Sequence, residues 1–288
     1  MKKQKKTLMI VVLVLICIFL ALLVSGLICN KNLRLNTFTI KSDNLPDSFN
    51  GYKIIHISDL HNATFGKDNE KLINMIADAE PDIIAITGDV VDCRRTDTQV
   101  ALDFIKKAVE IAPCYYVAGN HEARVPANFQ ILLDGFEEAG VTILRNQTIP
   151  LTRGDNSISL TGVDDPDFTV MSYSDVQYYI MDSTLQGLIS ADDDSFRILL
   201  SHRPEMLNVY TKYNIDLTLS GHAHGGQFRL PFVGGLYAPH QGLLPEYDSG
   251  LYTEGSSNLI VSRGIGNSLF PLRLFNSPEV ILITLTTE

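Results

Sequence analysis

The chain has 288 residues, of which 45% are hydrophobic and 19% are charged, so it is long enough to form a complete buried core. Its formal net charge of −10 argues against general binding to nucleic acid, which requires clustered lysine and arginine to neutralise phosphates. If the protein binds a phosphate, the positive charge must come from another source, such as bound metal ions.

The N-terminus combines basic residues with a long apolar segment. Four lysines lie within the first six residues, and an apolar run follows from Leu8 to Cys29. About 20 apolar residues can span a bilayer as a helix, whereas a signal peptide has a shorter apolar core and a small-x-small cleavage site. Val24-Ser25-Gly26 matches that site poorly, so we predict an uncleaved anchor over residues 1–30, with a cleaved signal as the alternative. The positive-inside rule then places the lysines in the cytoplasm and the rest of the chain outside the cell membrane.

The remaining chain is predicted to contain a linker followed by one folded domain. Residues 31–50 are polar and contain Pro46, which indicates a linker that leads into an edge strand near residues 35–40. The domain is assigned to residues 51–288, where short β-branched runs alternate with stretches of helical spacing. The predicted strands are 53–57, 82–87, 115–118, 158–162, 197–200, 217–219, 259–262 and 280–285, and the predicted helices are 69–79, 98–111, 129–139 and 204–212.

This alternation defines the fold class as α/β. Near-continuous apolar strands separated by helices indicate a sheet that is covered on both faces. The later strands have shorter, glycine-rich connections, which indicates a second sheet packed on the first. The four cysteines do not form a disulfide framework: Cys17 and Cys29 lie in the apolar segment, while Cys93 and Cys114 fall at opposite ends of predicted strands.

Five short polar motifs occur in order along the domain. The key residue of each motif comes just after a predicted strand, where open α/β sheets place their ligand crevices, so we expect all five on one rim. One such motif is weak support for a site, whereas five in order are strong support. The motifs are Asp59-Leu60-His61, Gly88-Asp89-Val90-Val91-Asp92, Gly119-Asn120-His121-Glu122, Ser201-His202 and Gly221-His222-Ala223-His224.

The residue types in these motifs are those of a metal site. Alternate residues of an extended segment point to the same side, so Asp59 and His61 can face one ion together. Carboxylates, imidazoles and one amide without thiolate favour Mn, Fe or Zn over Ca²⁺ and exclude sulfur clusters. Asp89 can bridge two ions because a carboxylate has two oxygens, and Asn120 offers a neutral carbonyl oxygen.

With these motifs the chain resembles the calcineurin-like metallophosphoesterase family over most of residues 52–287. The family pattern is Asp-x-His, Gly-Asp-x-x-Asp, Gly-Asn-His-Glu, a lone His and Gly-His-x-His. The resemblance implies a two-sheet β-sandwich flanked by helices, the αββα fold, and two divalent or trivalent transition-metal ions. It implies that one ion is held by Asp59, His61, Asp89 and His224, and the other by Asp89, Asn120, His202 and His222.

The resemblance also implies a mechanism. Two ions about 3.5 to 4 Å apart lower the pKa of a bridging water and clamp the attacking and leaving oxygens of an in-line displacement. His121 would be the catalytic histidine that holds no metal, acting on the leaving oxygen. Asp92 is a candidate to orient His121, because an imidazole needs its other nitrogen fixed.

Other polar residues near the motifs receive structural interpretations. His56 lies inside a predicted strand and is expected to be structural, and His240 is more often structural than in contact with substrate. Pro204 is expected to be the first residue of a helix. Arg124 and Arg203 flank predicted ligands and could contact phosphate oxygens, although a solvated surface arginine is the favoured interpretation for each.

The anchor and the segments 201–204, 221–227 and 262–266 resemble the bacterial membrane-associated branch of the family. Some members of related branches cleave phosphodiester or pyrophosphate bonds in lipid precursors. We therefore expect a membrane-anchored two-metal phosphoesterase that hydrolyses a phosphodiester or phosphoanhydride, with a lipid-linked envelope precursor as a candidate substrate. The alternatives are a phosphomonoesterase and a non-catalytic, metal-dependent binding module. Substrate specificity is expected in the loops 163–179 and 231–250, while the oligomeric state and the native metal pair stay open.

Overall fold

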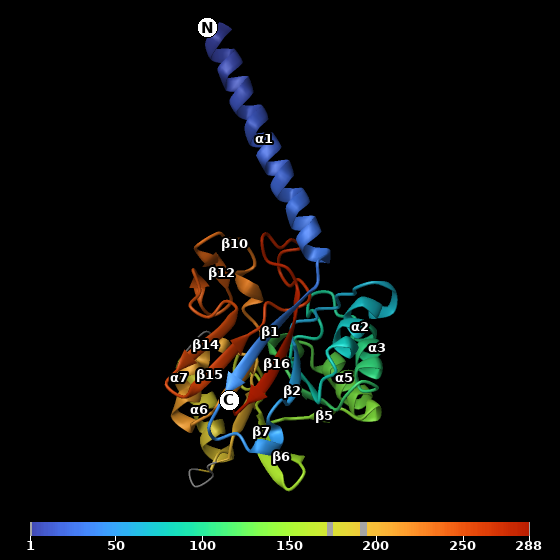
Figure 1. Cartoon of the computed structure of the whole chain (residues 1–288). Coiled ribbons are helices and arrows are strands. Elements are labelled where there is room, and N and C mark those ends of the chain that lie inside the picture. Colours follow the sequence, from blue (N-terminus) through green and yellow to red (C-terminus); the bar gives the residue numbers. More distant parts are fainter. Residues whose placement is uncertain (1, 172–174, 191–194, 288) are drawn as a thin grey trace.

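The computed structural model describes residues 2–171, 175–190 and 195–287. Two six-stranded sheets lie in the middle of the domain, and helices cover their outer sides (Figure 1). A single long helix, α1 (Lys2–Lys31), projects away from the domain. The αββα sandwich predicted above is therefore confirmed.

Both sheets are mixed: the first has one antiparallel pair, β16 with β2, and the second has an antiparallel pair at each edge, while the other neighbouring strands run parallel. In the first sheet the order is β1-β16-β2-β3-β4-β5, with bounds Arg34–Lys41, Glu279–Thr286, Lys53–Ile57, Ile83–Thr87, Cys114–Val117 and Thr142–Ile143. In the second sheet the order is β14-β15-β9-β8-β7-β6, with bounds Gly250–Glu254, Ser257–Val261, Leu217–Ser220, Arg197–Leu200, Asn156–Gly162 and Gln147–Arg153.

The alternation of side chains along β2 shows how the layers are built. Successive residues of a strand point to opposite faces. Ile54 belongs to the core between the two sheets, whereas Ile55 and Ile57 belong to the core under the helices. His56 is fully buried and its Nε2 lies 2.8 Å from the Thr87 hydroxyl, as expected for a structural histidine.

Helices α2 (Glu70–Asp78), α3 (Thr98–Ala108) and α5 (Pro126–Ala139) cover the first sheet, while α6 (Asp175–Leu188) and α7 (Leu207–Tyr210) cover the second. The ends of these helices follow from local chemistry. The Asp97 side chain caps α3 by accepting from the backbone N–H of Gln99 at 3.1 Å, and α5 begins at a proline and ends before Gly140, which has φ 89°.

Most predicted elements are confirmed with ends shifted by a few residues, two predictions need correction, and some strands were not predicted. The helix predicted over 204–212 is broken into a 3₁₀ turn (Pro204–Met206), α7 and a second 3₁₀ turn (Thr211–Tyr213). The last part of the loop predicted over 163–179 is the start of α6, and residues 172–174 of that loop lie outside the described residues. The strand β6 was not predicted, because its exposed residues give no apolar run.

The chain between the anchor and the domain is short. Helix α1 ends at Lys31 and β1 begins at Arg34, so residues 32–33 alone separate them. β1 pairs in parallel with β16 over its whole length and forms the predicted edge strand. Within the described residues, α1 is the one helix long and apolar enough to cross a membrane, over Gln4–Lys31. All four cysteines are free thiols, as predicted.

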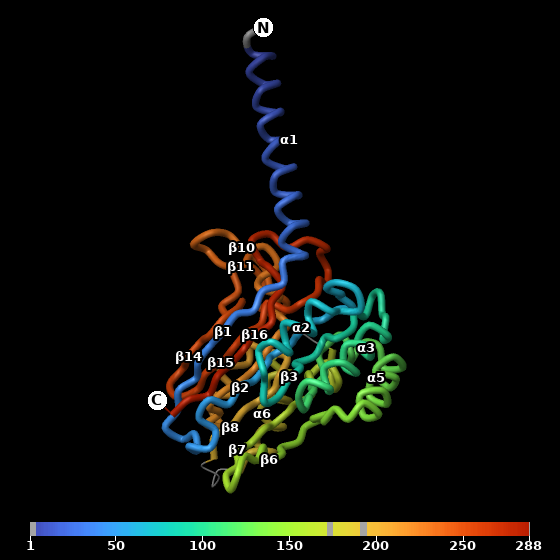
Figure 2. Tube along the Cα trace, turned by 45° about the vertical axis from the view of Figure 1, so that its right-hand side comes forward, coloured from blue at the N-terminus to red at the C-terminus, as the bar shows by residue number. Residues whose placement is uncertain are grey.

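Two small antiparallel pairs lie at the end of the domain from which α1 leaves, as both views show (Figure 2). They are β10 (Arg229–Leu230) with β11 (Gly234–Gly235), and β12 (Tyr237–Ala238) with β13 (Gly242–Leu243). The short helix α4 (Asn120–Ala123) and further 3₁₀ turns complete the domain; the turns are Asp47–Phe49, Lys67–Asn69, Pro166–Phe168 and His224–Gly226.

Candidate metal centre

The five motifs meet at one edge of the sandwich. Each follows the carboxyl end of a strand, three in the first sheet (β2, β3 and β4) and two in the second (β8 and β9). Because the two sheets pack face to face with these ends on the same side, residues up to 165 positions apart in the sequence come together. The motifs therefore lie at one common edge of the sheets, as expected.

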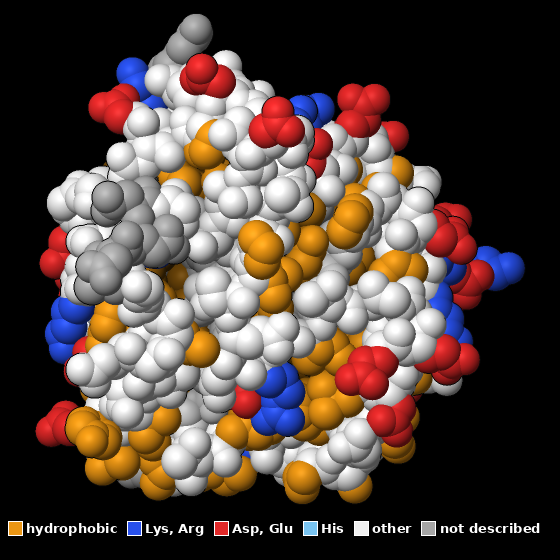
Figure 3. Space-filling view, turned by 90° about the horizontal axis from the view of Figure 1, so that it is seen from below, with side chains coloured by type: hydrophobic (Ala, Val, Ile, Leu, Met, Phe, Trp, Pro, Cys, Tyr) orange, Lys and Arg blue, Asp and Glu red, His pale blue; other side chains and the backbone are white. Residues whose placement is uncertain are grey.

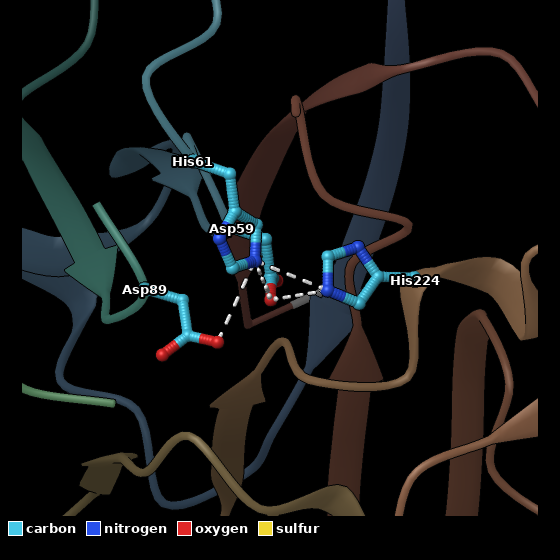
Figure 4. Close-up of side chains that lie close together, drawn as sticks. All are labelled: Asp59, His61, Asp89 and His224. Carbon is cyan, nitrogen blue, oxygen red and sulfur yellow. Dashed lines mark hydrogen bonds and ion pairs between the residues drawn. The ribbon is translucent and has the colours of Figure 1, made fainter. Parts of the chain in front are cut away.

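The first cluster contains Asp59, His61, Asp89 and His224, all buried (Figure 4). His61 Nε2 lies 3.2 Å from His224 Nε2 and 3.5 Å from Asp89 Oδ2. His224 Nε2 lies 3.3 Å from Asp59 Oδ1. Side-chain atoms of this kind converging on one point form a set that could hold a metal ion.

The second cluster contains Asp89, His202 and His222. His202 Nε2 lies 3.2 Å from Asp89 Oδ2 and 3.2 Å from His222 Nδ1. His202 Nδ1 lies 2.7 Å from the Thr87 carbonyl oxygen and donates to it, which directs the lone pair of Nε2 into the cluster. The Asn120 side-chain oxygen is buried and accepts no hydrogen bond from any described residue, as a carbonyl reserved for a metal would. The residues therefore fit two metal ions.

Asp89 belongs to both clusters, and its surroundings fix it firmly. Its Oδ1 accepts from the backbone N–H of His121 at 2.8 Å, while its Oδ2 faces the imidazoles. Glu122 holds the loops on either side: its carboxylate accepts from the backbone N–H groups of Asp89, Val90 and Gly119, each at 2.8 Å. Sequence reasoning assigned Glu122 no role, although its place in the Gly-Asn-His-Glu motif was a signal.

The backbone at the site is held in an uncommon conformation. A positive φ is rare outside glycine and costs energy that the surrounding structure must offset. Gly88, with φ 84°, makes the neighbouring turn possible, and a side chain on Gly88 or Gly119 would collide with the opposite loop. The site residues with positive φ are Asp59 (51°), His61 (42°), Asp89 (51°), His222 (67°) and His224 (49°).

The charges of the site suit a cation. Burial raises the pKa of Asp59 and of Asp89, but the neighbouring imidazoles outweigh burial and bring both pKa values below their usual range. Burial lowers the pKa of His224 to about 3, so this candidate ligand is neutral at pH 7. Burial also lowers the pKa of His202, but Asp89 raises it to about 10, which shows how strongly the site attracts positive charge.

His121 lies beside both clusters, on α4. Its Nδ1 accepts from the backbone N–H of Cys93 at 3.0 Å, and its Nε2 lies 3.3 Å from the Ser268 hydroxyl. The Asp92 carboxylate, expected to orient this imidazole, lies 3.9 Å from Nδ1 and makes no hydrogen bond to it. Asp92 instead accepts from the backbone N–H of Arg94 at 2.8 Å, so it shapes the loop that supplies Cys93.

The interpretation of Arg203 as a solvated surface residue is wrong. Its side chain is fully buried and donates to Asp165 at 2.7 Å and to Asp167 at 3.0 Å. Arg124 is about one-third exposed and pairs with Asp167 at 2.9 Å. Sequence reasoning could not see these pairs, because the acidic loop after β7 carries no motif and lies more than 35 residues from Arg203.

A cavity of about 160 Å³ opens beside the clusters, several times the roughly 30 Å³ of one water molecule. His240 lines it and places its Nδ1 2.9 Å from His222 Nε2. This contact can orient the His222 ring, whose other nitrogen faces His202. Arg94 also lines the cavity, and neither role was predicted. The other walls are Asp89, Asn120, His121, Arg124, His222–His224, Gln227, Tyr237, Pro239 and Ser268–Phe270.

Comparison with known proteins identifies the scaffold. The family model described as Calcineurin-like phosphoesterase matches residues 52–226. The chain is 34% identical over 259 residues to metallophosphoesterase YkuE of Bacillus subtilis (strain 168), covering 86% of this chain and 83% of that protein. It is 28% identical over 243 residues to phosphodiesterase YaeI of Escherichia coli (strain K12), covering 81% and 82%. It is also 28% identical over 262 residues to a transmembrane protein with metallophosphoesterase domain of Danio rerio, covering 85% and 56%.

Proposed function

Because the chain belongs to the calcineurin-like phosphoesterase family, a family of metal-dependent hydrolases, we propose that it cleaves a phosphodiester or phosphoanhydride with two transition-metal ions. The observation that carries the proposal is the position of Asp89 Oδ2 between the two histidine clusters, 3.5 Å from His61 Nε2 and 3.2 Å from His202 Nε2. One carboxylate placed in this way can serve two ions.

The ligand sets follow from the two clusters. Asp59, His61, Asp89 and His224 would hold one ion, and Asp89, Asn120, His202 and His222 the other. Their oxygen and nitrogen atoms suit Mn, Fe or Zn. When bound, two such ions supply an activated water and positive charge for in-line attack on phosphorus. The protein's own net negative charge then no longer prevents phosphate binding.

His121 is proposed to act on the leaving group. Because its Nδ1 accepts from Cys93, the neutral imidazole carries its proton on Nε2. That nitrogen lies 3.9 Å from Asp89 Oδ2, and His121 lines the cavity, so Nε2 can give a proton or a hydrogen bond to the departing oxygen. An intact histidine in this place supports an enzyme over a non-catalytic binding module.

A diester is proposed as the preferred substrate over a monoester. A monoester carries up to two negative charges on the reacting phosphate and a diester carries one, so a cavity with few available cations suits the diester better. Arg203 is buried in ion pairs and Arg124 pairs with Asp167, which leaves Arg94 as the more accessible arginine of the cavity wall. The name of the relative YaeI, a phosphodiesterase, points in the same direction.

The test is a direct comparison of substrates. The purified full chain, loaded in turn with Mn, Fe and Zn, is assayed on an aryl phosphodiester and on the matching monoester at one pH. We expect the higher kcat/KM on the diester. At least about tenfold higher efficiency on the monoester, a transition-state preference of about 1.4 kcal/mol, would establish the phosphomonoesterase alternative instead.

The apolar helix α1 and the transmembrane relative suggest membrane association. We propose further that α1 stays attached as a single-pass anchor, with the N-terminal lysines in the cytoplasm and the catalytic domain outside the cell. A lipid or envelope precursor that carries a phosphate ester is then a candidate substrate.

A further inference from the structure

Two segments of the domain contain no charged residue, and both expose large apolar side chains. Residues 230–245 and 264–272 have no Asp, Glu, Lys or Arg. In the first segment Phe232 is fully exposed and Leu243 is 80% exposed; in the second, Leu269 is 66% exposed. Exposed apolar side chains grouped in this way mark an interaction surface, whereas single exposed apolar residues are common on any protein. The other exposed large apolar residues of the two segments are Leu230, Val233, Tyr237, Leu244 and Phe270.

The two segments form one continuous surface, which we call the apolar rim. The Gln227 side chain donates to the carbonyl oxygens of Phe270 and Leu272 at 3.1 and 2.8 Å, and thus fastens the second segment to the base of the first. The rings of Phe228 and Phe270 pack 5.7 Å apart, and the backbone N–H of Arg229 donates to Leu274.

The apolar rim is attached to the end of the membrane-spanning helix. The backbone N–H of Arg273 donates to the Asn30 side chain at 2.9 Å, and the Asn30 amide donates to the carbonyl oxygen of Pro271. Gly26 of α1 also approaches the Arg273 carbonyl so closely that a methyl group there would be in contact with it. The loops of the rim lie beside the base of α1 (Figures 1 and 2).

This attachment sets the level of the rim relative to a bilayer. Lys31 ends α1 after a run without charges, and a basic residue at the end of a spanning helix lies among the lipid head groups. Asn30 is its neighbour, so the segment that Asn30 contacts lies at head-group depth too. The opposite end of the domain, seen in Figure 3, has acidic and basic side chains spread around its edge. The two ends therefore differ in charge: charged side chains lie around the edge of the far end, whereas the two segments of the rim contain none.

The apolar rim also borders the cavity. Tyr237 and Pro239 of the first segment and Ser268, Leu269 and Phe270 of the second form its outer wall, next to the candidate metal ligands. A molecule that enters the cavity would contact side chains of the apolar rim and candidate metal ligands together.

We propose that the apolar rim enters the outer part of the bilayer beside α1, and that the substrate is an amphiphile whose phosphate reaches the clusters while its apolar tail stays in the lipid. The first part depends on the rim and on the anchor alone. The second part rests on the proposed phosphoesterase function. The occupant of the rim is thus lipid rather than a protein partner or a second copy of this chain.

The first part is tested by fluorescence, because the chain contains no tryptophan. Phe232→Trp gives the full chain a single tryptophan in the rim. Tyr179→Trp, in α6 and 73% exposed, gives a matched control away from α1. Both variants are placed in phosphatidylcholine nanodiscs with and without bromine on the acyl chains. We expect blue-shifted emission that brominated lipid quenches for Phe232→Trp, and unshifted, unquenched emission for Tyr179→Trp.

Two results would overturn membrane seating. Emission of Phe232→Trp that matches Tyr179→Trp would mean that the rim faces water. A blue shift without quenching by brominated lipid would mean that protein, either a partner or a second copy, covers the rim.

The second part is tested with two diesters: a phosphatidyl diester carrying an aryl chromophore, placed in the same nanodiscs, and the matching soluble aryl diester. We expect Phe232→Asp to lower turnover of the membrane-borne diester by about tenfold, because a charge at this depth disfavours seating, and to leave the soluble diester unaffected. Equal losses on both would overturn the amphiphile assignment. Failure of the wild type to cleave either diester with any metal would refute the proposed diester hydrolysis, while the fluorescence result would stand by itself.

Discussion

His121 Nδ1 accepts a hydrogen bond from the backbone N–H of Cys93 at 3.0 Å, and this contact decides which nitrogen of the imidazole carries the proton. A neutral imidazole has one N–H, so Nε2 is the donor, and His121 lines the cavity. His121 thus presents its N–H beside the candidate metal clusters, and any residue at position 93 other than proline would supply the same backbone donor.

The first prediction concerns this histidine. His121→Ala should keep the full metal content, because His121 is not a proposed ligand, but lower turnover of the aryl diester by about 10² to 10⁴-fold. Metal content and kcat are measured on the same preparation. Cys93→Ala is the matched control: it keeps the backbone donor and should retain near wild-type turnover. Loss of metal together with activity in His121→Ala would show that His121 is a ligand.

The second prediction concerns the shared carboxylate. Elemental analysis of the purified full chain should find about two transition-metal ions per chain, and Asp89→Ala should reduce binding at both sites because its carboxylate faces both clusters. Asp59→Ala should impair the first site alone. Asp155→Ala, in the exposed turn between β6 and β7, serves as the control and should keep both ions. Full activity after exhaustive chelation would refute the two-metal mechanism.

The third prediction concerns the buried ion pairs of Arg203. Arg203→Met should lower the free energy of unfolding by about 3 to 5 kcal/mol at pH 7, because it leaves the buried Asp165 carboxylate without its cationic partner. Lys212→Met, which breaks an exposed pair of 3.1 Å with Asp182, should lower the free energy of unfolding much less, because water screens this pair. Urea unfolding in detergent, followed by circular dichroism, measures both. Equal losses of unfolding free energy in the two variants would contradict the expectation that a buried ion pair is costlier to break than an exposed one.

The same pair predicts a pH dependence. Burial raises the pKa of Asp165, but Arg203 outweighs burial and holds that pKa below its usual value. For an acid whose pKa is lowered by folding, the stabilisation is present above the unfolded value of about 3.9 and is lost as the pH falls through the folded value. The difference in unfolding free energy between wild type and Arg203→Met should therefore be constant near pH 7 and shrink below about pH 4.

The fourth prediction concerns orientation in the membrane. If the lysines before α1 stay in the cytoplasm, protease added to intact cells stripped of their wall should remove the catalytic domain and spare cytoplasmic markers. Immunoblots against both ends of the chain follow the cleavage. Complete protection of the domain, with digestion after lysis, would reverse the proposed orientation.

The sequence by itself determined the layers of the fold and the identity of the candidate ligands. Both are local properties: apolar residues such as Ile54 and Ile55 fill both faces of a buried strand, and Asp59, Asp89 and Asn120 each follow such a strand directly. The carboxyl ends of parallel strands share one edge, so local order along the chain was enough to predict that the motifs meet.

Only the tertiary structure decided what surrounds these residues. The burial of Arg203 against Asp165, the support of His222 by His240 and the contact of Asn30 with the loop of Arg273 each join segments with no shared motif. Such contacts arise from the packing of loops between the layers, where neither strand alternation nor helical spacing applies. For the same reason the sequence assigned Arg203 to solvent and left the apolar rim unrecognised, since exposure is a property of the packed domain and not of the residue.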